Sequence, residues 1–306
     1  MHGTNRDHVG SVLSALISEM PDLEVESVTR LGEGMVNVAF EVNGRLIVRF
    51  SKEPNPAKRA ALVNHEARLL ETVAGISTLP VPEPEFTVPH QGCLAYFKLP
   101  GTPLLDIPHE QRSAYAPSIG SALGELLAAL HSVPVGRMAD LVDTDVQPLD
   151  GWRADAADLV ERLGDQVPQA PRPAIDSFLA APPPAEPSSL VFSHNDLGIE
   201  HVLVNPSDGS VSGIIDWGDA AITDPAYDFG LLYRDLGPAA LQAALDSYLQ
   251  DVDLGRLRGR AEFYGRCSVF EDLAYGIEVE DPRYVDKAVA GFTWLFDAST
   301  PPGRPI

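Results

Sequence analysis

An Asn43-Gly44 pair lies between two runs of β-forming residues, 36–42 and 46–50, and this spacing limits the local fold strongly. Both central positions of a tight two-residue turn need a positive φ angle, which Asn and Gly adopt more readily than other residues. The pair therefore predicts a β-hairpin. A further β-type run at 27–31 precedes the hairpin, so we expect an antiparallel sheet near the start of the chain.

Helical patterns surround this predicted sheet. Apolar residues recur at helical spacing over 9–20, which predicts a short amphipathic helix. Asn55-Pro56 has the composition of a helix cap followed by a first-turn proline, and it predicts a helix that ends at Gly75. A β-type run follows at 93–99, and we place the hinge between two lobes directly after it, at 100–103.

The rest of the chain is mainly helical in pattern. Helical spacing dominates from 110 to 180 and gives way to short β-runs at 190–193, 201–204 and 211–216. A chain of 306 residues is long enough for two packed lobes. We therefore predict an α+β, bilobal fold, with a small sheet-bearing lobe at 1–97 and a mostly helical lobe at 98–306.

Composition narrows the class of protein. The formal charge is -22, with 44 acidic and 22 basic residues, which disfavours nucleic acid as a partner and favours a cationic one. Such a charge also fits a plain, highly soluble surface. The chain has no apolar run near the roughly 20 residues that span a bilayer, and its first residues lack the apolar core of a secretory signal. We expect a cytoplasmic protein without a membrane partner, and we favour a monomer.

Two carboxylates in the second half of the chain suggest chemistry. Asp196 follows His194-Asn195, and Asp216 stands between Ile215 and Trp217, twenty positions later. Each abuts a β-run, so the two side chains can converge. Phosphoryl transfer needs one carboxylate to position and deprotonate the accepting hydroxyl and another to bind the metal that bridges the phosphates. Either motif alone also fits a capped turn, so the prediction rests on their conjunction.

These motifs resemble the aminoglycoside phosphotransferase family, whose fold is that of the protein kinases. In that family the first motif reads His-Gly-Asp-Leu and ends at an Asn four positions later, and the second reads Ile-Asp-Trp or Ile-Asp-Phe. Here His201 replaces that Asn, as in the aminoglycoside 2''-phosphotransferases and the macrolide phosphotransferases. The resemblance implies that Asp196 is the catalytic base, that Asp216 and His201 hold Mg²⁺, and that Asp228 braces the catalytic loop.

The resemblance extends to the first lobe. Gly32 and Gly34 occupy the place of a kinase glycine loop, where backbone amides approach the phosphates of ATP or GTP. They also fit an ordinary turn between strands. In this family the hinge between the lobes binds the purine through main-chain atoms, which here implies Phe97 and Leu99.

An arginine replaces the phosphate-binding lysine of the kinases. Kinases place that Lys on the third strand and hold it with a Glu of the next helix. Arg49 stands at the matching strand position, and Glu66 is its expected partner. Because a guanidinium binds phosphate through two parallel hydrogen bonds, we expect nucleotide binding to be retained.

For the acceptor, the segment 270–277 resembles the acidic helix that faces the aminoglycoside in the 2''-phosphotransferases. Ammonium groups need carboxylates at close range. The resemblance therefore predicts a cationic small-molecule substrate, with an ordinary solvated helix face as the alternative. The expected contacts are Glu262, Glu271, Asp272 and Tyr275.

The sequence thus predicts a kinase that moves the γ-phosphate of ATP or GTP to a hydroxyl of an aminoglycoside-type antibiotic and so confers resistance. Arg49 and His201 also match the macrolide phosphotransferases, which keeps a macrolide 2'-phosphotransferase as an alternative. A kinase of small metabolites, acting on an amino sugar or amino alcohol, is a third candidate. A non-catalytic nucleotide-binding pseudokinase is the least favoured.

Overall fold

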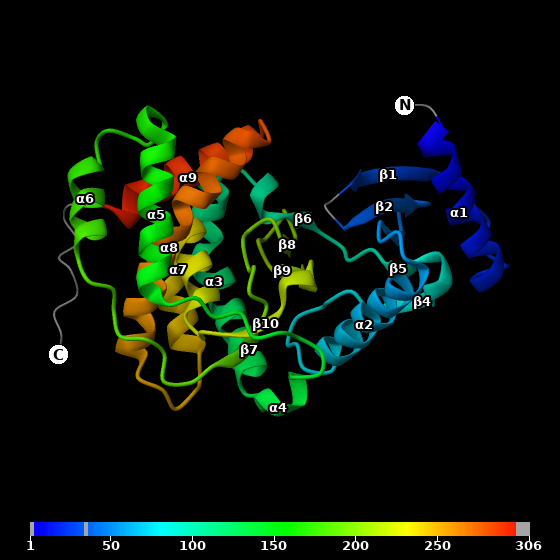
Figure 1. The fold of residues 1–306 in the computed structure, drawn as a ribbon, viewed down its shortest axis with the longest axis horizontal. Coiled ribbons are helices and arrows are strands. Elements are labelled where there is room, and N and C mark those ends of the chain that lie inside the picture. The colour runs from blue at the N-terminus through cyan, green and yellow to red at the C-terminus, as the bar shows by residue number, and fades with distance from the viewer. Residues whose placement is uncertain (1–2, 34–35, 298–306) are drawn as a thin grey trace. The chain divides into compact units, whose positions relative to one another are not determined.

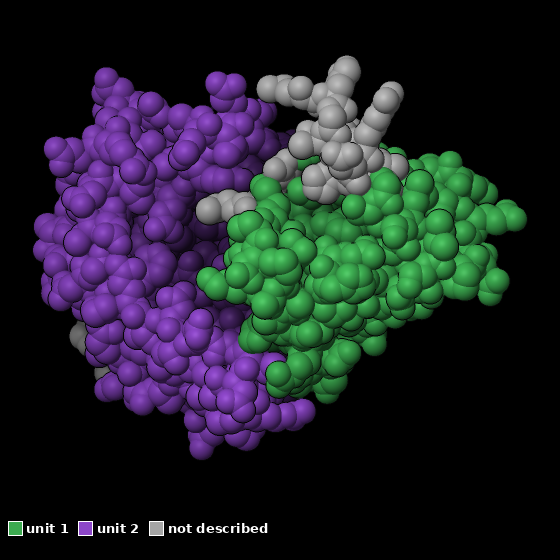
Figure 2. Space-filling view, turned by 45° about the vertical axis from the view of Figure 1, so that its right-hand side comes forward, with its two compact units in different colours: residues 1–99 green, residues 100–306 purple. Residues whose placement is uncertain are grey.

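The computed structural model describes residues 3–33 and 36–297 and divides the chain into two compact units, 1–99 and 100–306. Figure 2 gives the two units different colours. The division falls after Leu99, two residues beyond the predicted boundary after residue 97. No helix among the described residues is both long and apolar enough to cross a bilayer.

The first unit is built on a five-stranded antiparallel sheet in the order β1-β2-β3-β5-β4. The helix α2 connects β3 to β4, and α1 precedes the sheet (Figure 1). The elements are α1 Gly3–Glu19, β1 Val28–Glu33, β2 Asn37–Val42, β3 Leu46–Ser51, α2 Pro56–Ala74, β4 Pro84–Val88, the 3-10 turn η1 Pro89–Gln91 and β5 Cys93–Phe97.

The predicted hairpin is the joint between β2 and β3. Asn43 and Gly44 have φ angles of 53° and 68°, as a two-residue turn of this type requires. The Asn43 side chain also holds the segment before β1, because its Oδ1 accepts from the backbone N–H groups of Glu26 and Ser27 at 2.8 and 3.0 Å. The Asn43-Gly44 dipeptide therefore forms the turn between β2 and β3 and also fixes the segment that leads into β1.

The two faces of this sheet are covered by different helices. Alternate residues of β3, including Val48 and Phe50, pack in one apolar core with Leu16 of α1. Side chains point to opposite faces at successive strand positions, so Arg49 lies on the other face, where it bonds Glu66 of α2. As predicted, α2 begins after an Asn55 cap, whose Oδ1 accepts from the N–H groups two and three positions on, and its last residue precedes Gly75.

The second unit is mostly helical. Its central helix α7 packs against α3, α8 and α9, and α5 packs against α8 (Figure 1). The helices are α3 His109–His131, α4 Val135–Met138, α5 Leu149–Leu163, α6 Arg172–Ala180, α7 Tyr227–Ser247, α8 Leu254–Glu278 and α9 Pro282–Leu295. Short 3-10 turns are η2 Leu104–Asp106, η3 Gly164–Gln166 and η4 Trp217–Asp219. The predicted α+β class, with an antiparallel sheet first and helices after it, is confirmed.

Two glycines allow α3 and α7 to approach closely. A methyl group at Gly120 would lie 2.3 Å from the carbonyl oxygen of Ala240, and one at Gly124 would lie 2.2 Å from that of Ala244. Both distances are far inside van der Waals contact. The backbones of the two helices therefore touch at these positions, and the contact fixes α7 against α3.

Short strands in the second unit carry the loops of the candidate site. The strands β6, β8 and β9 form one small antiparallel sheet, and β7 pairs with β10 in another. One loop joins β7 to β8, and a second follows β9. The strands are β6 Thr102–Pro103, β7 Val191–Ser193, β8 Val202–Val204, β9 Val211–Ile214 and β10 Ala221–Thr223.

Candidate active site

The loop between β7 and β8 is held by a buried carboxylate. Asp228, in the first turn of α7, is fully buried. Its carboxylate accepts hydrogen bonds from the Ser193 hydroxyl at 2.5 Å, from the Asn195 N–H at 3.0 Å and from the Leu197 N–H at 3.1 Å. These contacts are those of a brace for the loop, which is the part that the family resemblance implies for Asp228.

Asn195 explains one departure from the family motif. The residue has a φ angle of 63°, in the left-handed region that Gly adopts freely and that Asn tolerates better than most residues. The family has Gly at this position, so the backbone requirement is met by a different residue. Unlike Gly, Asn195 also has a side chain that bonds elsewhere, and its Nδ2 donates to Asp145 at 2.9 Å.

His194 connects the two loops of the site. The residue is fully buried, and its Nε2 lies 3.0 Å from the carbonyl oxygen of Ile215, just before Asp216. Burial lowers the pKa of His194 to about 4, with the neighbouring Asp228 acting in the opposite direction. The ring is therefore neutral at pH 7, and because a carbonyl only accepts, Nε2 carries the proton.

The three residues predicted for catalysis and metal binding lie together. His201 Nδ1 is 2.8 Å from the carbonyl oxygen of Asp196 and 3.4 Å from its carboxylate. His201 Nε2 is 3.8 Å from the carboxylate of Asp216. The His201 side chain is mostly buried, whereas the carboxylates of Asp196 and Asp216 are 41% and 52% exposed. Two acceptor groups are thus open to a ligand, with an imidazole between them.

The hydrogen bond of His201 fixes which nitrogen is free. Nδ1 faces a carbonyl, which cannot donate, so in the neutral ring Nδ1 carries the proton. In that ring Nε2, which lies 3.8 Å from the Asp216 carboxylate, is the nitrogen with an available lone pair. Mg²⁺ keeps its ligands at about 2.1 Å, so two donor atoms of one ion are separated by at most about 4.2 Å. The 3.8 Å between Nε2 and the Asp216 carboxylate fits that limit.

Asp216 owes its position to an uncommon backbone conformation. It follows β9, precedes η4 and has a φ angle of 62°. A residue other than Gly in this region is typical of functional sites, because the surrounding structure must stabilise it. Among the described residues no three His, Cys, Asp or Glu side chains form a ready-made metal cage. An ion held here would take its other ligands from water and phosphate oxygens, as Mg²⁺ commonly does.

The environment of Asp196 also changes its acidity. Partial burial raises the pKa of Asp196 to about 7, and the attraction of His201 acts in the opposite direction. A carboxylate with a pKa near the working pH is well matched to take a proton from a hydroxyl.

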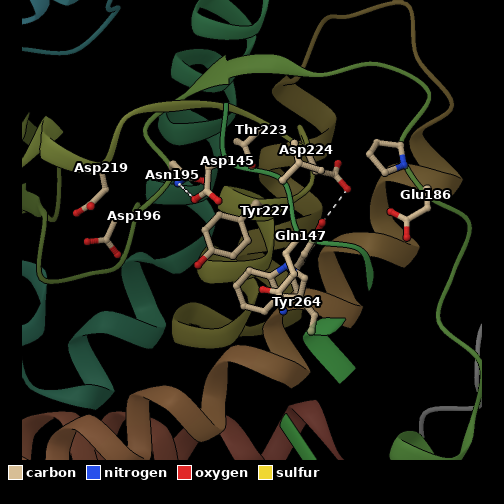
Figure 3. A pocket seen from close by; sticks show the side chains of 13 residues that line it. Asp145, Gln147, Glu186, Asn195, Asp196, Asp219, Thr223, Asp224, Tyr227 and Tyr264 are labelled. Carbon is tan, nitrogen blue, oxygen red and sulfur yellow. Dashed lines mark hydrogen bonds between the residues drawn. The ribbon is translucent and has the colours of Figure 1, made fainter. Parts of the chain in front are cut away.

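A cavity of about 330 Å³ opens beside Asp196 within the second unit (Figure 3). In Figure 3, Asp196 and Asp219 lie at one end of the group of lining residues, and Glu186 lies at the other. The lining is completed by Asp145, Val146, Gln147, Trp152, Pro187, Asn195, Thr223, Asp224, Tyr227 and Tyr264.

The cavity has an acidic and an aromatic part. Asp145, Glu186 and Asp219 are exposed carboxylates, whereas Asp224 is buried and already bonded to Arg260 at 2.8 Å. The aromatic part consists of three rings whose centroids are 5.3 to 5.5 Å apart, those of Trp152, Tyr227 and Tyr264. Carboxylates beside aromatic faces suit a cationic ligand, because both attract positive charge.

None of the four residues predicted to contact the substrate lines this cavity. Glu271 and Tyr275 are exposed on α8, and Glu262 is half-buried. Asp272 is buried, and its carboxylate is 2.9 Å from the Lys287 ammonium. Because Asp272 is already paired inside the protein, we assign it a structural part in place of the predicted contact with substrate.

The other exposed acidic residues of the cavity, Asp145, Glu186 and Asp219, were not predicted, because they belong to separate loops. Asp145 precedes α5, Glu186 lies in the Pro-rich segment before β7, and no short motif marks either of them. Asp219 carried a signal, since it lies three positions after Asp216 in the second motif. Only the fold brings these residues to one cavity.

In the first unit, the predicted partners Arg49 and Glu66 form an ion pair. Arg49 NH1 donates to Glu66 Oε1 at 2.7 Å, and both side chains are mostly buried. In the amide orientation that satisfies both groups, Asn37 Oδ1 accepts from Arg49 NH2 at 2.7 Å. The guanidinium is thus fixed on the sheet by two neighbours.

The other residues predicted for nucleotide binding lie at strand ends. Gly32 is exposed in β1, next to a change of register with β2. Gly34 lies outside the described residues. Phe97 ends β5 and is 45% exposed, and Leu99 follows it, half-buried.

Comparison with solved structures identifies the fold. An aminoglycoside 2'-phosphotransferase-IIIa in complex with GDP has a TM-score of 0.66 and 22% identity, with 95% of this chain and 99% of that chain covered. A macrolide 2'-phosphotransferase from Brachybacterium faecium, solved as apoenzyme, has a TM-score of 0.62 and 21% identity, with 96% and 99% covered. At these identities the matches establish the kinase-like fold, as predicted.

Sequence comparison identifies the family. A curated aminoglycoside 3'-phosphotransferase from Streptomyces fradiae is 30% identical over 151 residues. That match takes in 46% of this chain and spans only about half, 54%, of the relative. The model of the phosphotransferase enzyme family, APH, matches residues 27–264, which contain the Asp196 and Asp216 motifs. The chain therefore belongs to the phosphotransferase enzyme family, as its sequence motifs predicted.

Proposed function

We propose that the chain transfers the γ-phosphate of a nucleoside triphosphate to a hydroxyl group of a cationic, aminoglycoside-type molecule. The observation that carries this proposal is the location of Asp196 in the wall of an acid-lined cavity. Asp196 is the residue that family resemblance makes the base. A cationic acceptor bound in the cavity would present its hydroxyl to that carboxylate.

In this mechanism Asp196 orients the acceptor hydroxyl and takes its proton as the oxygen attacks phosphorus. His201 holds the loop through its bond to the Asp196 carbonyl, so the carboxylate keeps its direction. Asp145, Asp219 and Glu186 would bind ammonium groups of the acceptor. Such positioning supplies most of the catalysis in phosphoryl transfer, because the reaction needs little covalent help from the protein.

For the donor, we propose ATP or GTP with Mg²⁺. His201 and Asp216 would hold the ion, which would neutralise charge on the phosphates when bound. Arg49 would bind phosphate oxygens while Glu66 keeps the guanidinium in place. The glycine-bearing segment with Gly32 and Gly34, and the hinge with Phe97 and Leu99, would bind the rest of the nucleotide.

The lining of the cavity favours an aminoglycoside over a macrolide. A macrolide needs a larger apolar pocket with fewer acids, whereas Asp145, Glu186 and Asp219 offer exposed carboxylates. The aromatic rings beside them keep the macrolide as a second candidate. Because the donor is a cytoplasmic metabolite, we place the reaction in the cytoplasm, with antibiotic resistance as its expected consequence.

Turnover by the purified chain tests the proposal. Consumption of ATP and of GTP would be measured with Mg²⁺ against aminoglycosides, macrolides and amino alcohols, with Asp196→Asn as the matched variant. We expect aminoglycoside-dependent turnover that falls by about 10²- to 10⁴-fold in Asp196→Asn, the usual contribution of a general base. Macrolide-only turnover would reject the acceptor class, and full activity in Asp196→Asn would reject the assigned base.

A further inference from the structure

A buried cluster of charged side chains lies behind the catalytic loop in the second unit. Its centre is Lys287 of α9, whose side chain is 1% exposed. The Lys287 ammonium is 2.9 Å from the Glu200 carboxylate, 2.9 Å from Asp272 and 3.6 Å from Asp235. Arg234 adds a second cation and binds Asp235 through two hydrogen bonds. The cluster therefore joins α7, α8 and α9 to Glu200, which precedes His201.

The catalytic loop enters this cluster at two successive residues. The N–H of Ile199 donates to the Asp235 carboxylate at 3.1 Å. The side chain of Glu200 folds back over the loop toward Lys287. A methyl group at Gly198 would lie 2.7 to 2.8 Å from the Glu200 carboxyl group, so only a glycine there leaves room for this arrangement.

Two aspartates on α7 hold successive parts of the loop. Asp228 binds the N–H groups of Asn195 and Leu197, and Asp235 binds that of Ile199. The two aspartates are seven positions apart, which is two helical turns, so they lie on one side of α7. The loop is thus held along α7 by hydrogen bonds on both sides of Asp196, as far as Ile199.

From this arrangement we propose that Lys287 is a positioning residue, which acts through Glu200 to fix His201 and Asp196 in their working geometry. The inference rests on the proposed phosphotransfer. Lys287 touches neither the candidate base nor the candidate metal ligands, so its effect passes through the ion pair with Glu200. The family match ends at residue 264, before α9 begins. Through Lys287, the proposal nevertheless gives α9 a part in the reaction.

The physical reason is that the Lys287 ammonium compensates the charge of the Glu200 carboxylate in a buried place. Glu200, Asp235 and Asp272 place three carboxylates around Lys287 and Arg234. Removing one partner of a buried pair leaves an uncompensated charge, which moves toward water if it can. Glu200 belongs to a loop and can move, and any such movement displaces the adjacent His201. Displacement of a catalytic group by about 1 Å reduces turnover by about 10²-fold.

The test compares Glu200→Gln and Lys287→Met with Trp294→Phe as the matched control. Trp294 also joins α9 to α7, since its Nε1 donates at 2.9 Å to the carbonyl of Tyr233, a partner outside the catalytic loop. We expect kcat to fall by about 10- to 100-fold in the first two variants, with KM for the acceptor nearly unchanged. The double variant should be no worse than Lys287→Met alone, because Lys287→Met already removes the ion pair that Glu200→Gln breaks.

A second readout is independent of activity. Hydrogen–deuterium exchange of the peptide 194–202 should be faster in Glu200→Gln and in Lys287→Met than in the unmutated chain, and unchanged in Trp294→Phe. If the unmutated chain phosphorylates no acceptor, the proposed function fails, while the exchange result still decides the positioning. If Lys287→Met does not fold, the exchange rate and kcat of Glu200→Gln alone decide whether the ion pair positions the loop. Unchanged exchange and unchanged kcat in Glu200→Gln, or the same losses in Trp294→Phe, would overturn the inference.

Discussion

At the residue scale, the clearest contrast is between acids that are open to a ligand and acids that are already paired. Asp219 is exposed in the cavity beside Asp196, whereas Asp272, in the predicted substrate helix, is bonded to Lys287. Sequence cannot separate the two cases, because both are aspartates near a motif. The two cases are distinguished only by the burial of each carboxylate and by the side chains that it contacts in the structure.

Asp219→Asn tests which carboxylates bind the acceptor. We expect KM for an aminoglycoside to rise by about 10- to 100-fold in this variant, because a charge-assisted hydrogen bond contributes about 1.5–3 kcal/mol. Glu271→Gln, on the exposed face of α8 outside the cavity, should leave KM within about twofold. Steady-state kinetics at saturating nucleotide would measure both. The reverse order of effects would return the binding site to the α8 face.

His131 gives a prediction for pH. It is buried at the end of α3, where Nδ1 bonds the Tyr248 hydroxyl at 2.8 Å and Nε2 bonds the Ser193 hydroxyl at 3.1 Å. Burial lowers its pKa to about 3. Below pH 6.5 the unfolded chain binds a proton at this residue and the folded chain does not, so the free energy of unfolding decreases as pH falls from 6.5 toward 3.

Between pH 6.5 and pH 5 this loss amounts to about 2 kcal/mol, at about 1.4 kcal/mol per pH unit. His131→Gln has no such group, so its free energy of unfolding should decrease by about 2 kcal/mol less over the same range. Urea unfolding of both proteins at the two pH values measures the difference. Parallel pH dependences would contradict a neutral, buried His131.

At the element scale, the sequence predicted the first sheet well because its signals are local. Asn43-Gly44 and the Asn55 cap each act within a few residues, and both do what their chemistry predicts. No local sequence pattern predicted that α9 contributes Lys287 to the buried cluster. Lys287 is 87 positions from Glu200, and only the packing of α9 brings them together.

The contact between α3 and α7 predicts an effect opposite to helix propensity. Alanine is about 1 kcal/mol better than glycine inside a helix. Gly120→Ala should nevertheless destabilise the protein by about 1–3 kcal/mol, because its methyl group would overlap the Ala240 carbonyl. Gly259→Ala is the control, since it lies inside α8 with no atom within 4 Å of the added methyl group. It should be neutral or stabilising.

Thermal unfolding of the two variants measures this contrast. A gain in stability from both substitutions would show that the backbones of α3 and α7 do not touch at Gly120. The prediction could not be made from sequence alone, because both glycines lie inside helical patterns and nothing in those patterns says which of them faces another backbone.

At the scale of the whole molecule, two motifs identified the family and the fold, although each is short. Asp196 and Asp216 are separated by β8 and β9, and this small sheet returns the second loop to the first. The order and spacing of the motifs reflect that path, which is why they were informative. The acid-lined cavity reflects contacts between distant loops, so nothing in the sequence indicated it, and the substrate contacts predicted on α8 lie outside its lining.

The central claim is that Asp196 directs a phosphoryl group to a cationic acceptor. Mass spectrometry of kanamycin incubated with the chain, Mg²⁺ and either ATP or GTP tests it most directly, with Asp196→Asn alongside. We predict that kanamycin gains one phosphoryl group with the unmutated chain and that the gain is lost with Asp196→Asn. An unmodified acceptor with both donors, or equal modification by the Asp196→Asn variant, would contradict the claim.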